Sequence, residues 1–157
     1  MEVGDKVPHL TAQATSGVTF DTDALKGRPW IIYFYPKDNT PGCTQEGQDF
    51  RDHYGEFQSL GYDIFGVSKD SLRTHENFRA KHQFPFELIS DPEEVICRAF
   101  DVIRLKKNYG REYMGIERST FIVDAEGVVR HIWRKVRVKG HVAEVLEAAR
   151  ALARGED

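Results

Sequence analysis

The hydrophobic residues of this chain gather into short runs that polar segments separate. Residues 30–35 form a continuous aromatic and β-branched run that Pro36 ends, and residues 62–68 form a second run of the same kind. Continuous apolar runs of this length are typical of strands buried on both faces. Residues 87–89 predict a short third strand, and residues 18–21 predict a short edge element.

The segments between these runs predict helices over residues 41–60, 72–82, 92–100 and 140–154. In the last of them the apolar residues lie on one helical face: Val142, Val145, Leu146, Ala149 and Leu152. Residues 119–123 and 128–133 flank a turn that contains Gly127 and predict a β-hairpin. This order of elements predicts an α/β fold, with a central mixed sheet flanked by helices.

Length, composition and charge narrow the function classes. A chain of 157 residues predicts one domain over residues 1–157. The net charge of -3 offers no electrostatic basis for binding nucleic acid or an anionic membrane. No apolar run approaches the roughly 18 residues of a membrane span, and residues 1–10 lack a signal-peptide pattern. Two cysteines do not make a disulfide scaffold, so a reducing, cytoplasmic setting is expected.

One of the two cysteines lies where a helix is predicted to begin. Thr40 suits the N-cap and Pro41 the first helical position, so Cys43 falls in the first turn. The free amide groups and the helix dipole favour a thiolate there. The position also follows a central strand, where open α/β sheets bind ligands. One helical face carries Cys43, Gly47, Phe50, Tyr54 and Phe57. This arrangement fits either a reactive thiol or a small core residue.

The residues around Cys43 resemble a known family. Residues 36–46, PKDNTPGCTQE, match the peroxiredoxin signature Pro-x-x-x-Thr-x-x-Cys. The Thr-Pro-Gly-Cys-Thr-x-Glu form resembles the branch called bacterioferritin comigratory protein or PrxQ. Further similar segments occur in the same order, at residues 4–8, 66–71, 88–91 and 117–124. The resemblance implies a thioredoxin-like fold with peroxiredoxin additions. It also implies a thiol peroxidase that reduces hydrogen peroxide and organic hydroperoxides without a cofactor.

The same resemblance implies roles for four residues. Cys43 would be the peroxidatic nucleophile, which becomes a sulfenic acid. Thr40 would offer its hydroxyl to the peroxide, and Arg118 would hold a positive charge against the thiolate. Pro36 would shield the pocket from water. The simpler interpretations are that Thr40 is only an N-cap and Arg118 only a solvated charge at the end of a strand.

Other polar residues are expected to have no catalytic part. Glu46 is interpreted as complementing the helix dipole, and Lys37, Asp38 and Asn39 as solvated loop residues. The six histidines form no compact metal-ligand pattern and are expected on the surface: His9, His53, His75, His82, His131 and His141. A basic cluster is interpreted as a solvated face, with docking of an anionic or protein reductant as the alternative: Arg130, Arg134, Lys135, Arg137 and Lys139.

A peroxidatic cysteine needs a second thiol to complete its cycle. Many PrxQ-type proteins carry this resolving cysteine five positions later, where this chain has Gln48. Others carry it in the next helix, where Arg79 aligns. Only Cys97 remains, and it is predicted to be partly buried, to one side of its helix's apolar face. The carboxylates of Glu93, Glu94 and Asp101 are expected to raise the pKa of that thiol.

Two catalytic cycles therefore remain open at this point. In the first, a one-cysteine enzyme uses an external thiol, which could be thioredoxin, glutaredoxin or glutathione. In the second, Cys97 resolves the Cys43 sulfenic acid and thioredoxin reduces the bond. A disulfide oxidoreductase is disfavoured because it normally needs a Cys-x-x-Cys motif, and the residue three positions after Cys43 is Glu46 instead of a cysteine. A noncatalytic interaction domain on the same fold is the alternative of another class. The resemblance favours a monomer.

Overall fold

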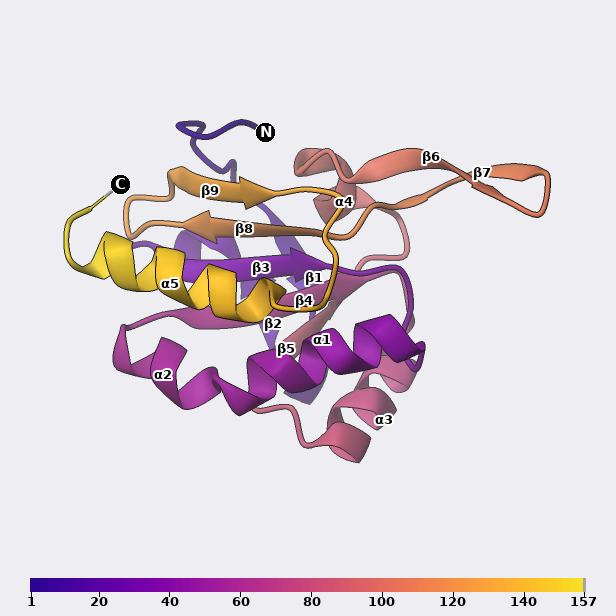
Figure 1. The fold of residues 1–157 in the computed structure, drawn as a ribbon, viewed down its shortest axis with the longest axis horizontal. Helices are drawn as coiled ribbons and strands as arrows, with labels where there is room; N and C mark the ends of the chain where they lie inside the picture. The colour runs from indigo at the N-terminus through magenta and orange to yellow at the C-terminus, as the bar shows by residue number, and fades with distance from the viewer. Residues whose placement is uncertain (157) are drawn as a thin grey trace.

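The computed structural model describes residues 1–156, and Asp157 at the end of the predicted domain lies outside the described residues. Its centre is a five-stranded sheet in the order β5-β4-β3-β8-β9 (Figure 1). The strands are β3 (Trp30–Phe34), β4 (Asp63–Ser68), β5 (Glu87–Ser90), β8 (Ser119–Val123) and β9 (Val129–Trp133). The pairs β3–β4 and β4–β5 are parallel, whereas β3–β8 and β8–β9 are antiparallel. The predicted mixed sheet is confirmed.

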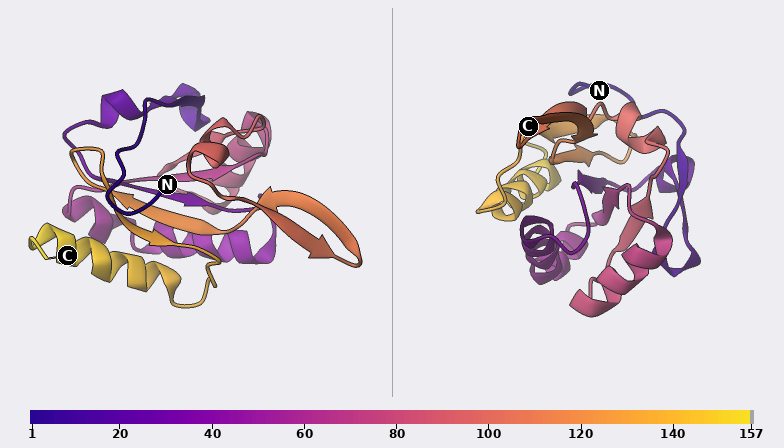
Figure 2. Two further views of the ribbon diagram at one scale, coloured as in Figure 1. Left: turned by 90° about the horizontal axis from the view of Figure 1, so that it is seen from above. Right: turned by 90° about the vertical axis from the view of Figure 1, so that its right-hand side faces the viewer.

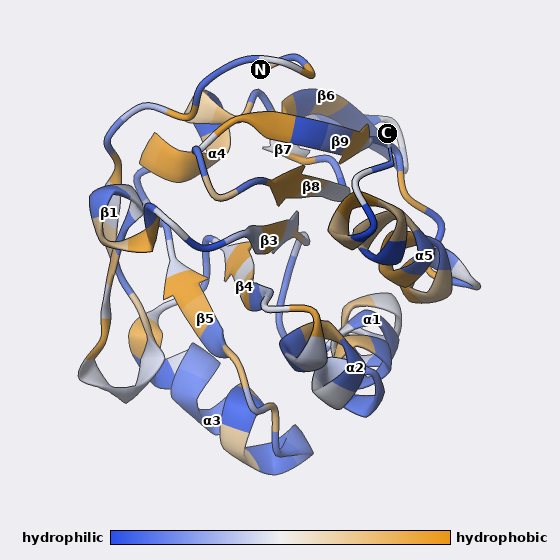
Figure 3. Ribbon diagram, turned by 90° about the vertical axis from the view of Figure 1, so that its left-hand side faces the viewer, coloured by the Kyte–Doolittle hydropathy of each residue, from blue (hydrophilic) through white to orange (hydrophobic). Residues whose placement is uncertain are grey.

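Among residues 1–156, five α-helices flank this sheet: α1 (Pro41–Asp52), α2 (Tyr54–Ser59), α3 (Leu72–His82), α4 (Val95–Ala99) and α5 (His141–Ala153). Two 3₁₀ helices, η1 (Thr15–Gly17) and η2 (Thr22–Leu25), lie near the N-terminus. Figure 3 shows α1, α2 and α5 on one side of the sheet and α4 on the other. Within residues 1–156, every helix falls short of the length and hydropathy that crossing a membrane requires.

Two of the predicted helices differ from those in the structure. The helix predicted over residues 41–60 is divided at His53, whose φ of -102° and ψ of 4° interrupt the helical ladder between α1 and α2. The helix predicted over residues 92–100 is reduced to α4. Glu94, the residue before α4, has a left-handed conformation with φ of 62°, which a continuous helix cannot contain.

The sheet separates two hydrophobic cores. Alternate residues of β3 point to opposite faces, so Ile31 and Tyr33 enter one core while Ile32 and Phe34 enter the other. The first core lies beneath α1, α2 and α5 and includes Cys43. The second lies on the α4 side and includes Cys97. The alternation within one buried strand therefore puts the two cysteines in different cores.

Two antiparallel pairs outside the central sheet were only partly predicted. The edge element over residues 18–21 is β2 (Thr19–Asp21), but its partner β1 (Thr11–Gln13) was missed. The hairpin of β6 (Ile103–Asn108) and β7 (Arg111–Ile116) was missed entirely. Figure 2 shows it projecting beyond the body of the molecule. Its strands are largely exposed and polar, so they lack the apolar runs that identified the others.

The packing of α1 on the first core depends on Gly47. A Cβ atom there would lie 2.4 Å from Cζ of Phe84, a buried ring stacked on Phe86. We expect Gly47→Ala to lower the free energy of unfolding by about 1–3 kcal/mol, because a packed ring cannot move away freely. Denaturant titration measures the change. Gly55→Ala in α2 is the control, since no atom lies within 4 Å of its Cβ. An unchanged stability in Gly47→Ala would contradict the prediction.

Candidate active site

The site begins where residues 36–40, called here the site loop, connect β3 to α1. Pro41 is the first residue of α1, and Thr40 is the N-cap with extended φ and ψ of -89° and 152°. Cys43 is therefore in the first turn, as predicted, where unpaired backbone amides and the positive end of the helix dipole face the thiol. Its side chain belongs to the first core, and the residue is only 2% exposed. This burial excludes bulky reactants from the sulfur in this conformation.

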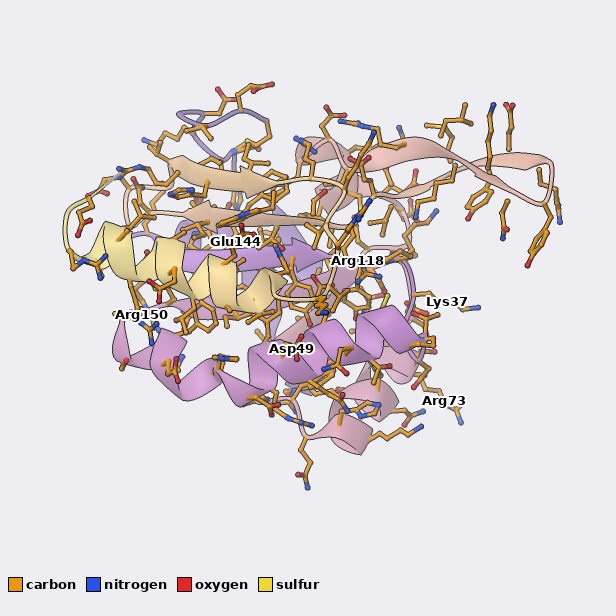
Figure 4. The ribbon with its side chains drawn as sticks, viewed as in Figure 1. Lys37, Asp49, Arg73, Arg118, Glu144 and Arg150 are labelled. Carbon is orange, nitrogen blue, oxygen red and sulfur yellow. The ribbon has the colours of Figure 1, made fainter. Side chains whose placement is uncertain are left out.

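Arg118 brings a positive charge to the thiol from just before β8. Its Nη2 lies 3.4 Å from Sγ of Cys43, and its Nη1 lies 2.6 Å from Oε1 of Glu46. Burial alone would lower the pKa of Arg118, but the charges of Glu46 and Cys43 raise it above its usual value. Arg118 therefore holds a fixed charge at the sulfur. Figure 4 shows Arg118 within the body of the molecule, whereas Lys37 points outward from the site loop.

Glu46 has a different position from the one predicted. It lies beyond the first turn of α1, with its side chain fully buried, and it pairs with Arg118 instead of complementing the helix dipole. Burial raises its pKa to about 7, and the nearby Arg118 opposes that rise. Within residues 1–156, its Oε2 has no hydrogen-bond partner. One carboxylate oxygen thus orients the guanidinium that contacts Cys43.

Thr40 occupies the N-cap position without capping the helix through its side chain. Its Oγ1 donates a hydrogen bond to the carbonyl of Lys37 at 2.8 Å, within the site loop. Because its hydrogen is used there, the hydroxyl oxygen retains its lone pairs as acceptors. The interpretation of Thr40 as a helix cap is therefore correct for the backbone only.

Pro36 is exposed and lines a cavity of about 400 Å³ beside the site. The other residues around this cavity come from β4, β6 and β7 and the segments next to them: Lys37, Lys69, Asp70, Lys106, Tyr113, Met114, Gly115 and Ile116. Burial, and next the charge of Arg118, lower the pKa of Lys106. The unpredicted hairpin thus contributes a wall and a cation next to the site.

Two predictions about polar residues are wrong, one for Asp38 in the site loop and one for two of the histidines. Asp38, expected in solvent, is 3% exposed and contacts the Tyr35 hydroxyl and Nδ1 of His75, each at 2.6 Å. His75 is fully buried and His141 is 4% exposed, so these two histidines are not on the surface. Burial lowers the pKa of His141 to about 4. The sequence pattern did not reveal the contact between Asp38 and His75 because the two residues are 37 positions apart in the chain.

Two clusters of possible metal ligands form in the described part of the chain. Donor atoms of His9, Asp21 and Asp23 lie within 4.8 Å of one another, as do those of Asp38, Asp70 and His75. In the second cluster both ring nitrogens of His75 already face protein oxygens, so its donors are paired within the protein. The sequence spacing predicted neither cluster.

Cys97 is buried more completely than predicted. It is 0% exposed in α4, and its backbone amide donates to Asp91 Oδ2 at 2.8 Å. Burial, and next the charge of Asp91, raise the pKa of the thiol far above its usual value. The predicted rise in the pKa of Cys97 is therefore confirmed, but its main charged neighbour is Asp91 and not Glu93 or Asp101. Cys43 and Cys97 are both free thiols.

Both alternative positions for a resolving cysteine make ordinary structural contacts. Gln48 Nε2 lies 3.4 Å from Nδ1 of His82. Arg79 Nε donates to the carbonyl of Phe86 at 2.9 Å, and its guanidinium pairs with Glu87. Neither position can supply a thiol to Cys43.

The predicted basic cluster is not a uniformly solvated face. Arg134 donates to the carbonyl of Asp101 at 2.8 Å, and its guanidinium lies 5.4 Å from the centre of the Phe121 ring. Arg130 pairs with Asp124 at 3.4 Å. The remaining members line a cavity of about 600 Å³ together with Arg134 and residues of α5: Lys135, Arg137 and Lys139. Part of the cluster therefore holds strands and loops together.

Known protein families and proteins are similar to this chain over most of its length. The model of the AhpC/TSA family matches residues 3–132. The chain is 49% identical to a peroxiredoxin Bcp of Bacillus subtilis over 153 residues, which is 98% of each chain. It is 52% identical to a peroxiredoxin Bcp of Xanthomonas campestris over 145 residues, or 92% of this chain and 91% of the relative.

Solved structures of similar proteins share the fold. The bacterioferritin comigratory protein of Xanthomonas campestris, described for its alkyl peroxide reduction activity, superimposes with a TM-score of 0.88 at 49% identity and covers 92% of both chains. A PrxQ mutant from Xylella fastidiosa gives a TM-score of 0.93 at 37% identity, with 98% of both chains covered. These neighbours confirm the thioredoxin-like peroxiredoxin fold. The chain belongs to the AhpC/TSA family and, within it, to the Bcp/PrxQ peroxiredoxins, which are thiol peroxidases.

Proposed function

We propose that Cys43 carries out a one-cysteine peroxidase cycle. Its thiolate attacks the terminal oxygen of a hydroperoxide, so an S–O bond forms while the O–O bond breaks. The peroxide proton leaves with the departing oxygen as water or an alcohol. The sulfur loses two electrons and becomes a sulfenate, which takes up a proton to give the sulfenic acid. The contact between Arg118 and Cys43 Sγ, at 3.4 Å, supports this assignment.

Three other groups are assigned to the same step. Arg118 stabilises the thiolate and the charge that moves along the S–O–O line, because it is fixed by Glu46 before the peroxide arrives. Thr40 accepts a hydrogen bond from the peroxide through the lone pairs that its bond to Lys37 leaves available. Pro36 bounds the pocket on the side of the 400 Å³ cavity and limits the access of water.

An external thiol completes the cycle in this proposal. A first thiol displaces water from the Cys43 sulfenic acid to form a mixed disulfide, and a second thiol releases Cys43 and leaves as a disulfide. The observation that carries this choice is the separation of Cys43 and Cys97 into cores on opposite faces of the sheet. A disulfide requires Cα atoms within about 7 Å, so a bond between cysteines in cores on opposite faces of the sheet would require local unfolding. The raised pKa of Cys97 also makes it a poor nucleophile.

The reductant and the setting form part of the same proposal. Thioredoxin, glutaredoxin and glutathione all supply thiols in the cytoplasm, where cysteines are kept reduced. We place the enzyme there as a single-domain monomer that reduces hydrogen peroxide and organic hydroperoxides. The alkyl peroxide reduction described for the Xanthomonas campestris relative supports the second class of substrate.

Mass spectrometry of the oxidised protein distinguishes the one-cysteine cycle from the Cys97 cycle. The protein is treated with one equivalent of hydrogen peroxide, then trapped with dimedone and digested without reductant. We expect a dimedone adduct on Cys43 and a free Cys97, because the sulfenic acid has no thiol within reach. A peptide pair joined through Cys43 and Cys97, lighter by two hydrogens, would establish the two-cysteine cycle instead.

A further inference from the structure

The site loop is anchored from below by a buried ionisable network that the peroxidase step does not use. Asp38 lies in the middle of the loop, between Pro36 and Thr40, and its side chain is 0% exposed. Both of its carboxylate oxygens are engaged, Oδ1 by the hydroxyl of Tyr35 and Oδ2 by Nδ1 of His75. Such a side chain fixes the loop at its midpoint because burying an unpaired carboxylate is costly.

His75 connects this midpoint to the sheet. It belongs to α3, and its Nε2 lies 2.9 Å from the carbonyl oxygen of Ile89 in β5. A carbonyl oxygen only accepts, so Nε2 carries a proton, and a further proton lies between Nδ1 and Asp38 Oδ2. The ring thus links the loop to β5 through hydrogen bonds at both of its nitrogens. This arrangement leaves the imidazole no free nitrogen for a metal or a substrate.

The backbone of the loop is held at the same point. The amide of Asp38 donates to Oδ2 of Asp70 at 3.0 Å, and Ser68 Oγ also donates to that oxygen. Asp70 is in turn fixed by its carbonyl, which accepts from Ser90 Oγ at 2.6 Å. The side chain of Asp38 is therefore tied directly to α3, and its amide is tied to Asp70, which is linked to β4 through Ser68 and to β5 through Ser90. Asn39, the next residue, has a positive φ of 64°, a conformation that such anchoring helps to maintain.

We propose that Asp38, His75 and Asp70 are positioning residues for peroxide reduction. They hold the site loop so that Thr40 and Pro36, on either side of Asp38, form the peroxide pocket above Cys43. They do not touch the peroxide, and they are not needed to produce the thiolate, which Arg118 and the beginning of α1 stabilise. This proposal rests on the assignment of Thr40 and Pro36 to the pocket. It predicts that loosening the loop slows the reaction with peroxide but not other reactions of the thiolate.

The test compares two reactions of Cys43 in the full-length protein. Stopped-flow fluorescence gives the rate constant for oxidation by hydrogen peroxide, and mass spectrometry gives the rate of alkylation by iodoacetamide. In Asp38→Ala we expect oxidation to slow on the order of 100-fold, as small displacements of positioned groups typically cause. Alkylation should be unchanged or faster, because it needs the thiolate and access but not the pocket. Asp38→Asn should retain most of the oxidation rate, since its amide can donate to Nδ1 and accept from Tyr35.

Controls separate positioning from simple loss of stability. His82→Ala, in the last turn of the same helix α3, should change both rates by less than about twofold. If Asp38→Ala does not fold, Tyr35→Phe provides a milder variant, with about tenfold slower oxidation and unchanged alkylation expected. A parallel fall of both rates, or an Asp38→Asn loss as large as that of Asp38→Ala, would overturn the proposal. So would full oxidation rates in the variants that fold.

Thr40→Val tests the underlying assignment independently. It removes the hydroxyl but leaves the contacts of Asp38 intact. If oxidation in Thr40→Val remains at the wild-type rate, the role given to Thr40 is wrong, whatever the Asp38 variants show. If oxidation slows in Thr40→Val but not in Asp38→Ala, the role of Thr40 stands and the positioning network fails.

Discussion

Cys43→Ser is expected to abolish peroxide reduction, whereas Cys97→Ser should retain activity within about twofold of the wild type. The serine hydroxyl is not ionised at neutral pH and cannot form a sulfenic acid, so the first step has no nucleophile. Cys97 lies in the other core, beyond the sheet, and its pKa is raised by burial and by Asp91. The measurement is peroxide consumption with a thiol reductant in excess.

These two variants form a matched pair because each replaces one of the two buried, free thiols in the chain. Folding is checked by circular dichroism, since a hydroxyl in the second core can destabilise the protein without affecting catalysis. Measurable turnover in Cys43→Ser would contradict the entire site assignment. A strong loss in folded Cys97→Ser that affects the steady state but not the first oxidation would instead identify Cys97 as the resolving thiol.

Arg118→Ala should lower kcat/KM for hydrogen peroxide by about 100- to 1,000-fold, the usual cost of removing one preorganised donor from a site of developing charge. The guanidinium contacts Cys43 through one nitrogen and Glu46 through the other, so a point charge is not an equivalent replacement. Arg118→Lys should therefore recover only part of the loss. Steady-state kinetics at saturating reductant measures kcat/KM in both variants. The rate of Cys43 alkylation shows how far the reactivity of the thiol itself has changed.

The neighbouring Glu46 provides the control for this experiment. In Arg118→Ala the Glu46 carboxylate remains buried without its cation, which costs stability unless it takes up a proton. The double variant Arg118→Ala/Glu46→Gln removes the unpaired buried charge. We expect it to be more stable to denaturant than Arg118→Ala and equally inactive. Recovery of activity along with stability would mean that Arg118 acts through the fold alone and not on the peroxide.

Much of this site could be predicted from local sequence. A buried strand, a loop with prolines, an N-cap and a first-turn cysteine are consecutive in the chain, and each is recognised from its neighbours. The resemblance of residues 36–46 and 117–124 to the peroxiredoxins then indicated the reaction class and the roles proposed for Thr40 and Arg118. The hairpin of β6 and β7 was missed because its exposed strands lack apolar runs. Its turn residues Tyr109 and Gly110 both have positive φ, as type I′ turns require, but the usual Asn-Gly signal is absent.

The sequence by itself determined the α/β class, the position of Cys43 at the beginning of a helix and the lack of a cysteine at position 48. Local periodicity and capping carry that information. Only the tertiary structure decided which distant groups meet: Arg118 with Glu46 across 72 residues, and Asp38 with His75 across 37. It also decided that Cys43 and Cys97 lie in different cores. These contacts depend on how strands pair and which face of the sheet each helix covers, and no local pattern of residues records that choice.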